Sequence, residues 1–208
     1  AFIIIVHLFF VLFFFIRLIL YKERELSTFL EGISVIICAK DECDNLKNNL
    51  PLFLEQDYPN YEVILVDDQS IDGTKYLLQD FEARYSNLKV VTIDSHINSR
   101  IGKKIPLSIG IKTAKFSYVL LSDADCSPVS KDWIKRMSEN FSIRDIVLGI
   151  SPYKKKKGWL NKIIRYDQFQ VALQYLSFAL AGIPYMGVGR NLGYKRSLFF
   201  KVKGFASH

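Results

Sequence analysis

The feature that most constrains the fold is a short apolar run that stops abruptly in acids. Residues 63–66, Val-Ile-Leu-Val, have the length and composition of a strand buried on both faces. Asp67-Asp68-Gln69-Ser70-Ile71-Asp72-Gly73-Thr74 follows directly, and then Leu77, Leu78, Phe81 and Tyr85 recur at helical spacing. A strand, a polar loop and a helix in this order form the repeating unit of a parallel α/β sheet.

The same unit recurs along the chain. Apolar strand patterns lie at residues 33–38, 88–93, 118–121 and 146–150, and helical patterns lie at 46–54, 103–114 and 131–141. We therefore expect an α/β fold with a Rossmann-like, mainly parallel sheet covered by helices on both faces. Residues 159–181 predict a long aromatic and apolar helix, residues 182–193 are glycine-rich and irregular, and residues 194–202 return to helix or strand.

The first twenty residues are almost wholly aliphatic and aromatic, with His7 and Arg17 the polar exceptions. A helix of this length spans about 30 Å, the thickness of a bilayer core. We expect a transmembrane helix over residues 1–21, a linker over 22–32 and one domain over 33–208; a buried core helix is the alternative for the first segment. Arg17, Lys22 and Arg24 lie at its carboxyl end, which predicts a single-pass membrane anchor with the domain in the cytosol.

The net charge of +7 is compatible with anionic lipid, a phosphorylated substrate or nucleic acid. Lys154 to Lys157 lack the interleaved aromatics of a single-strand binding groove, so we expect no nucleic-acid partner. Beside an anchor, attraction to anionic headgroups is favoured, with a solvated loop as the alternative. Cys38, Cys43 and Cys126 show neither metal-ligand spacing nor a disulfide framework, which favours reduced structural thiols.

A second acidic site, Asp123-Ala124-Asp125, follows the strand pattern at 118–121. In an extended chain residues i and i+2 point the same way, so both carboxylates can face one point. Two such carboxylates repel unless a cation lies between them, and Mg²⁺ or Mn²⁺ suits hard oxygen ligands. Ligands of open α/β sheets bind at the carboxyl ends of strands, where these acids and Asp67-Asp68 are expected. In the structural alternative, Asp72 caps a helix and Asp67 and Asp68 are turn residues.

Gly102-Lys103-Lys104 supplies the opposite charge at the head of a predicted helix. A lysine and a helix amino end together can neutralise a diphosphate. The Gly-x-x-x-x-Gly-Lys-Ser/Thr pattern of a Walker loop is not present here, and two solvated lysines are the alternative. With the acids, these residues indicate a metal–diphosphate site.

Five blocks in this order resemble the signatures of family 2 glycosyltransferases with the GT-A fold. They are residues 33–42 (ISVIICAKDE), 66–74 (VDDQSIDGT), 102–111 (GKKIPLSIGI), 122–125 (SDAD) and the glycine-rich 187–196 (GVGRNLGYKR). The resemblance spans about residues 34–205. Each block is common alone, whereas the ordered set is highly specific.

The resemblance implies transfer of a sugar, with inversion, from a nucleotide-diphosphate donor to a glycan or lipid-linked acceptor; a UDP-sugar is the favoured donor. By position it implies a donor half at 33–127 and an acceptor half beginning at 128–208. Donor-binding residues would be Ala39, Glu42, Asp67, Asp68, Ser70, Lys103 and Asp123. Asp125, with Asp123, would hold Mg²⁺ or Mn²⁺, and the acceptor side would include Gly189, Arg190 and Asn191.

In this family the general base follows the Gly-Phe turn in an acidic motif. Here Gly204-Phe205 is followed by Ala-Ser-His208, so we expect the base beyond His208 and a domain that is incomplete at its carboxyl end. Three alternatives stay open at this point. They are a haloacid-dehalogenase-like phosphatase with Asp123 as nucleophile, a nucleotidyltransferase, and a membrane-tethered sugar-nucleotide-binding module without catalysis.

Overall fold

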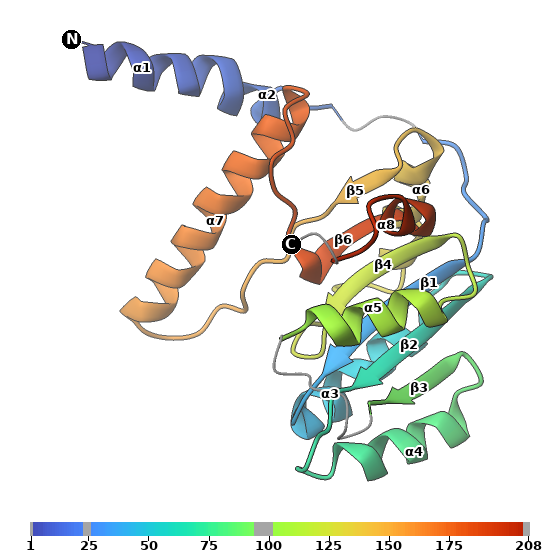
Figure 1. Cartoon of the computed structure of the whole chain (residues 1–208). Coiled ribbons are helices and arrows are strands. Elements are labelled where there is room, and N and C mark those ends of the chain that lie inside the picture. The colour runs from blue at the N-terminus through green and yellow to red at the C-terminus, as the bar shows by residue number, and fades with distance from the viewer. Residues whose placement is uncertain (1, 23–25, 94–101, 206–208) are drawn as a thin grey trace. The chain divides into compact units, whose positions relative to one another are not determined.

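The computed structural model describes residues 2–22, 26–93 and 102–205 (Figure 1). Contacts group the chain into two units, one of residues 1–25 with 148–188 and the other of residues 26–147 with 189–208. The domain limits expected from the sequence therefore stay predictions, since residues 148–188 group with the amino-terminal segment. Arg24 in the linker, the loop residues 99–101 and His208 lie outside the described residues.

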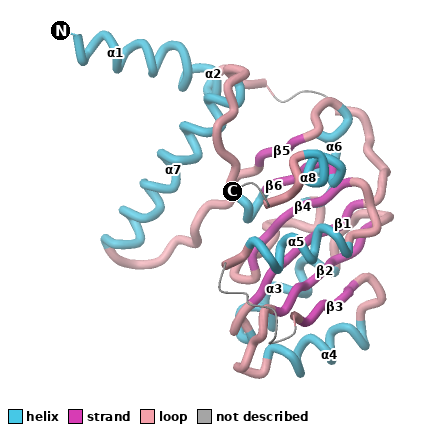
Figure 2. Tube along the Cα trace, in the orientation of Figure 1, coloured by secondary structure: helices cyan, strands magenta, loops and turns pink. Residues whose placement is uncertain are grey.

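The larger unit is built on a six-stranded sheet of order β3-β2-β1-β4-β6-β5 (Figure 2). β1 pairs in parallel with β2 and with β4, β2 pairs in parallel with β3, and β6 runs antiparallel to β4. The mainly parallel α/β sheet expected from the sequence is confirmed. The strands are β1 (Ile33–Ala39), β2 (Tyr61–Asp67), β3 (Leu88–Thr92), β4 (Tyr118–Asp123), β5 (Ile146–Leu148) and β6 (Leu192–Lys195).

Helices cover both faces of the sheet because side chains of β1 alternate between two apolar cores. Val35 and Ile37 enter the core formed with α3 (Cys43–Leu54), α4 (Thr74–Arg84) and α6 (Trp133–Glu139). Ile36 enters the core formed with α5 (Lys104–Thr113) and α8 (Arg196–Lys201). Short 3₁₀ turns, η3 (Asn140–Ser142) and η4 (Gly189–Asn191), complete this unit.

Two elements differ from the sequence expectation. The irregular stretch expected up to Gly193 ends earlier, because β6 begins at Leu192, and residues 194–202 contain both the end of a strand and a helix. The reason is close packing: a Cβ on Gly193 would lie 2.6 Å from Leu120 Cδ2 and 2.9 Å from Phe141 Cζ, so any larger residue would force these side chains to shift. The helix expected at 131–141 is also shorter and starts at Trp133.

The amino-terminal edge of the sheet carries a buried polar cluster. Glu62, at 7% exposure, accepts hydrogen bonds from Ser34 Oγ (2.6 Å) and the Lys115 backbone amide (2.8 Å) through one oxygen, Oε1. Ser34 Oγ in turn accepts from the Phe116 amide at 3.3 Å. These bonds fix the turn between α5 and β4 against β1 and β2.

The smaller unit contains the apolar amino-terminal segment and the long helix α7 (Trp159–Leu180). The segment forms α1 (Phe2–Phe10), a π-helical turn η1 (Val11–Phe15) and α2 (Ile16–Ile19). Among the described residues, Phe2–Ile19 is the one helical stretch long and apolar enough to cross a membrane, a criterion of length and composition alone. The Phe14 and Phe178 rings stack with centroids 4.1 Å apart, so α7 packs on this segment.

Candidate active site

The carboxyl ends of β1, β2 and β4 meet at one edge of the sheet and bring together residues far apart in the sequence. In the strand register, Ala39 at the end of β1 lies opposite Asp67, and Cys38 lies opposite Asp123. The Asp68 amide donates to the Ala39 carbonyl at 2.8 Å, which extends this pairing beyond β2. The acids expected at separate strand ends therefore flank the same end of β1.

The loops that follow β1 and β2 are tied to each other by hydrogen bonds. The Asp41 amide donates to Ser70 Oγ at 2.9 Å, and the Ile71 amide donates to Asp41 Oδ1 at 2.8 Å. Asp41 and Gln69 both adopt the left-handed conformation, with φ of 54° and 61°. Strained backbone of this kind persists where surrounding contacts hold it, and it is frequent at binding sites.

Asp68 is the most unusual acid of this edge. Its residue is 8% exposed, yet its Oδ1 atom is buried and has no hydrogen-bond partner among the described residues. Leaving a buried acceptor unpaired costs roughly 1 to 3 kcal/mol. Its neighbour Asp67 is satisfied, because Oδ1 accepts from the Ser70 amide at 3.2 Å. Asp68 therefore carries an acceptor that the described part of the chain does not use.

Lys103 lies at the head of α5 and pairs with the end of β4. Its Nζ is 3.0 Å from Asp123 Oδ1, with 68% of the lysine side chain and 32% of the aspartate side chain exposed. Burial lowers the pKa of Lys103, but the hydrogen bond and charge of Asp123, with contributions from Cys38 and Asp125, outweigh it and raise the pKa overall. The ammonium is thus charged at neutral pH.

Close packing of α5 on the sheet positions this lysine. Gly110 stands where a Cβ would lie 2.5 Å from Ile36 Cγ2 and 3.2 Å from Val66 Cγ2. The missing side chain lets α5 approach β1 and β2 closely. The amino end of the helix, with Gly102 at φ 65° before it, is thereby held at the acidic edge.

A tight turn brings Asp123, Asp125 and Cys126 together. The Cys126 amide donates to the Asp123 carbonyl at 3.0 Å, and Asn49 Nδ2 of α3 donates to the Ala124 carbonyl at 3.2 Å. One ligand atom from each of Asp123, Asp125 and Cys126 lies within 4.8 Å of the others. The two carboxylates are near each other because of this turn, which corrects the expectation that strand alternation would align them.

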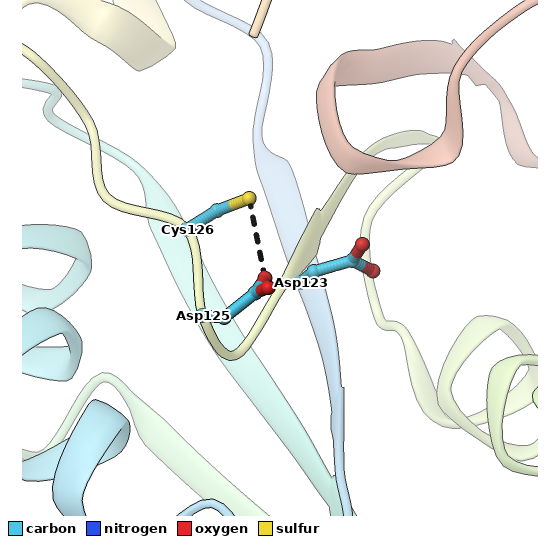
Figure 3. A group of neighbouring side chains, drawn as sticks. All are labelled: Asp123, Asp125 and Cys126. Atoms are coloured by element: carbon cyan, nitrogen blue, oxygen red, sulfur yellow. Dashed lines mark hydrogen bonds between the residues drawn. The ribbon is translucent and has the colours of Figure 1, made fainter. Parts of the chain in front are cut away.

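Figure 3 shows how the three side chains differ in direction. The Asp125 carboxylate turns toward the Cys126 thiol, with Sγ 3.5 Å from Oδ1, and the Asp123 carboxylate turns the other way. The separation of donor atoms still suits one divalent cation, whose oxygen ligands lie about 2.0 to 2.6 Å away. Carboxylates with room for phosphate and water ligands fit Mg²⁺ or Mn²⁺.

The charges at this edge change the pKa values of two thiols, Cys38 and Cys126. Burial raises the pKa of Cys38 to about 12; Lys103 opposes this shift, whereas Asp123 and Asp68 add to it. Burial and then the charge of Asp125, followed by that of Asp123, raise the pKa of Cys126 to about 11. Both thiols are therefore protonated at neutral pH. The pKa of Cys38 depends on charges from the loop after β2, the residue before α5 and the end of β4.

The glycine-rich block also lies at this edge. Leu192 of β6 pairs with Leu121 of β4, so η4, which directly precedes β6, lies beside the carboxyl end of β4. Trp133 Nε1 of α6 donates to Asn191 Oδ1 at 3.1 Å and holds the turn. A Cβ on Gly189 would meet nothing within 4 Å, so packing does not explain this glycine.

Other residues singled out in the sequence have structural partners. Glu42 accepts from Asn45 Nδ2 at 2.6 Å at the start of α3, and Ser70 joins the two loops as described. Asp72 accepts from the Thr74 hydroxyl (2.6 Å) and amide (3.1 Å) and from the Cys43 amide (2.9 Å), so it fixes the starts of α4 and α3. The Thr74 bond chiefly lowers the pKa of Asp72. The N-cap of α4 is Gly73, and Asp72 stands one residue before it and bonds Thr74.

Three participants were not anticipated from the sequence. Cys38 and Cys126 are adjacent in sequence to Ala39 and Asp125, a proximity that could have indicated their place at the edge. The Trp133–Asn191 bond joins residues with no shared motif, and no sequence signal predicts it.

Comparison with known proteins decides the family. Residues 34–202 match the model of "Glycosyl transferase family 2". The chain belongs to this family. It is 32% identical over 148 residues to the glycosyltransferase AglE of Haloferax volcanii, which covers 69% of this chain and 47% of that protein.

Solved structures share the fold at low identity. The mannosyltransferase PcManGT of Pyrobaculum calidifontis, in complex with GDP-Man and Mn²⁺, gives a TM-score of 0.68 at 21% identity, over 89% of this chain and 51% of that one. S. aureus TarS 1–349, in complex with UDP-GlcNAc, gives 0.59 at 20% identity, over 82% and 47%. The chain thus spans about half the length of these three proteins. It belongs to a glycosyltransferase family, and the phosphatase and nucleotidyltransferase alternatives lose their support.

Proposed function

We propose that this chain binds a nucleotide-diphosphate sugar together with a divalent cation at the carboxyl edge of its sheet and transfers the sugar with inversion. One observation carries the proposal: Asp68, Asp123, Asp125 and Lys103 come from three segments and converge around the end of β1. The acids suit the cation, the lysine suits the diphosphate, and the unpaired oxygen of Asp68 suits the nucleobase. Together they match the parts of a nucleotide sugar with its metal ion.

The nucleoside part of the donor would lie against Asp68. The unpaired Oδ1 can accept a hydrogen bond from the ring N–H of a uracil or a guanine, and Ala39 and Glu42 lie in the neighbouring loop. A UDP-sugar is the donor we favour. TarS in complex with UDP-GlcNAc and PcManGT in complex with GDP-Man show that proteins of this fold take both bases.

The diphosphate would lie between the turn at Asp123–Cys126 and the head of α5. Lys103 Nζ is within reach of both, and an exposed ion pair such as Lys103–Asp123 is worth about 0 to 1 kcal/mol, so a phosphate can replace Asp123 as its partner. The amino end of α5 adds a favourable dipole.

Asp125, with Asp123, would hold Mg²⁺ or Mn²⁺. When bound, such an ion supplies Lewis-acid stabilisation of the leaving diphosphate. The Mn²⁺ in the PcManGT complex supports this choice of ion. Asp125 is exposed and Asp123 partly exposed, which leaves coordination positions open to phosphate and water.

The acceptor would approach from η4, where Gly189, Arg190 and Asn191 lie beside Asp123. A glycan or lipid-linked acceptor suits a domain tethered to a membrane, and we place the tether at Phe2–Ile19 with the domain cytosolic. The general base stays a prediction beyond His208, outside the described residues.

A thermal-shift panel tests this function directly. Nucleotide sugars and nucleoside diphosphates, each with and without Mn²⁺, should raise the melting temperature of the chain only for donors with the correct base and only with the ion. No shift with any nucleotide would contradict the donor site. Because the general base is expected beyond His208, this chain should bind donor and transfer sugar slowly. Donor binding without release of nucleoside diphosphate by a longer chain that carries the base would favour the non-catalytic binding module.

A further inference from the structure

The first half of α7 and the loop before it form a surface that the glycosyltransfer site does not use. We call this the basic-aromatic head and define it as residues 151–169. It contains six basic side chains, at 154–157, 162 and 165, against one acid, Asp167. It belongs to the same unit as the amino-terminal apolar segment.

Five exposed apolar residues of the head lie within a sector of about 160° around α7, which also contains Asp167, whereas the exposed Phe169 lies outside it. Trp159, Ile163 and Tyr166 follow one another at spacings of four and three, and Leu160 and Ile164 are four apart. All five are exposed, Trp159 at 78% and Leu160 at 70%. So many large apolar side chains in one exposed patch mark a surface that contacts something apolar.

The lysine run is held against the helix by side chains on its other side. Asn161 accepts from the Lys156 amide at 2.7 Å and donates to the Lys154 carbonyl at 3.2 Å. Gln168 accepts from the Tyr153 amide at 2.8 Å and also donates to the Ser151 carbonyl. These bonds fix the backbone of the lysine run against the side of α7 opposite Trp159 and Ile163, and they leave the ammonium groups exposed to solvent or to headgroups.

A cation also lies on the aromatic anchor itself. Lys162 Nζ is 5.1 Å from the centre of the Trp159 ring, and Lys154 to Lys157 are all exposed. Tryptophan beside lysines is the composition of a helix that lies in the headgroup layer, with the ring at the acyl boundary and the ammonium groups among anionic phosphates.

The contact between α7 and the apolar segment agrees with a position of α7 in the headgroup layer of a membrane. Phe178 stacks on Phe14, less than two helical turns before the candidate span ends at Ile19. That end of the span adjoins Lys22, where the chain would leave the bilayer. With Phe2–Ile19 across a bilayer, this contact would place the carboxyl end of α7 near the boundary between lipid and water.

We propose that the basic-aromatic head docks on an anionic membrane surface and gives the chain a second attachment beside its amino-terminal helix. The exposed face of Trp159, Leu160 and Ile163 enters the interface, and Lys154 to Lys157 pair with anionic headgroups. This attachment does not depend on the donor site, so it stands or falls separately from the proposed function.

The tryptophan content of the chain gives a direct test. The sequence has 2 tryptophans, Trp133 and Trp159, so a Trp133→Phe variant of the full chain reports from Trp159 alone. After reconstitution into vesicles of phosphatidylglycerol and phosphatidylcholine, Trp159 emission should shift to shorter wavelength and be quenched by acyl-chain-brominated lipid. If Trp133→Phe fails to fold, the difference between the unaltered chain and Trp159→Phe isolates the same signal.

Matched charge variants separate the roles of lysine and lipid. Replacing Lys154 to Lys157 with glutamine should lower the ratio of docked to undocked head about fivefold for each lysine removed. Replacing four exposed lysines of the other unit, Lys47, Lys75, Lys89 and Lys112, changes net charge equally and should leave quenching unchanged. Water-like Trp159 emission in anionic vesicles would overturn the proposal and assign the head to a protein partner. Equal docking in purely zwitterionic vesicles would also overturn it.

Discussion

The two ends of strand β2 both carry buried acids, and they are in opposite situations. At the amino end, Glu62 uses Oε1 for two hydrogen bonds, from Ser34 and from the Lys115 amide. At the carboxyl end, Asp68 is buried to the same degree, yet its Oδ1 has no partner among the described residues. Among the described residues, the buried acid Glu62 is paired at the amino end of β2, whereas one oxygen of Asp68 is unpaired just beyond its carboxyl end.

We interpret this difference as one between a structural acid, Glu62 in β2, and an acid proposed to bind the donor, Asp68 just after β2. A buried polar group that the fold satisfies contributes to stability, whereas one left unpaired lowers stability and is available to a ligand. The comparison predicts that substitutions at the amino edge change stability and those at the carboxyl edge change binding. The following experiments test this division between stability and binding.

The largest expected effect is on stability, from Glu62→Ala. The variant removes the acceptor of Ser34 Oγ and of the Lys115 amide and opens a cavity, so the free energy of unfolding should fall by roughly 2 to 4 kcal/mol. Urea denaturation measures the change. Glu62→Gln retains a carbonyl oxygen and should lose less. A loss of nucleotide affinity in the folded variant would contradict a purely structural role of Glu62.

Gly193 and Gly189, on the proposed acceptor side, test the same division between stability and binding. Gly193→Ala should lower the free energy of unfolding by roughly 1 to 3 kcal/mol, because the added Cβ meets Leu120 and Phe141. Gly189→Ala, with open space around its Cβ, should leave the melting temperature nearly unchanged and reduce transfer to the acceptor in a protein that carries the general base. Equal destabilisation of both variants would show that Gly189 is structural.

Asp68→Asn tests the other end of β2. The amide replaces a buried carboxylate and loses the charge, so stability should stay level or rise by up to about 1 kcal/mol. Affinity for the donor should fall by up to about tenfold, because the amide oxygen still accepts a hydrogen bond but a weaker one than the charged carboxylate. Calorimetry with the nucleoside diphosphate and with the nucleoside alone should show the same loss, since Asp68 would contact the base.

The smallest effect concerns the thiol at the acidic turn. The carboxylate of Asp125 helps to raise the pKa of Cys126 to about 11, so alkylation should be slow at neutral pH and should accelerate as pH rises toward that value. Asp125→Asn removes the charge and lowers the pKa, so the rate at pH 8 should rise a few-fold. Mass spectrometry of the labelled peptide measures it. An unchanged rate would contradict the geometry in Figure 3.

Much of the fold follows from local patterns. The apolar runs that became β1, β2 and β4 have strand length and end in polar residues, and the glycine and lysine before α5 mark its start. Because parallel strands share a carboxyl edge, strand assignment alone predicted that Asp67, Asp68 and Asp123 would lie near one another. Five ordered blocks then gave the family.

Other parts depend on contacts that no local pattern encodes. β6 reads as a glycine-rich loop because Gly193 is needed for the approach of Leu120 and Phe141, side chains from distant segments. The proximity of Asp125 to Asp123 comes from a turn closed at Cys126 and held by Asn49 of α3, rather than from strand alternation. The hydrogen bond between Trp133 and Asn191 likewise joins segments that are far apart in the sequence.

The central claim is that Asp125, with Asp123, holds a divalent ion against the phosphates of an activated sugar. Calorimetric titration of UDP and GDP into the chain, with Mn²⁺ and with chelator, tests it most directly when repeated on Asp125→Ala. We expect Mn²⁺-dependent binding of one nucleotide to the unaltered chain and at least a tenfold loss of affinity in the variant, on the scale of 1.4 kcal/mol per factor of ten. Equal affinity in the two proteins, or binding that does not depend on Mn²⁺, would contradict it.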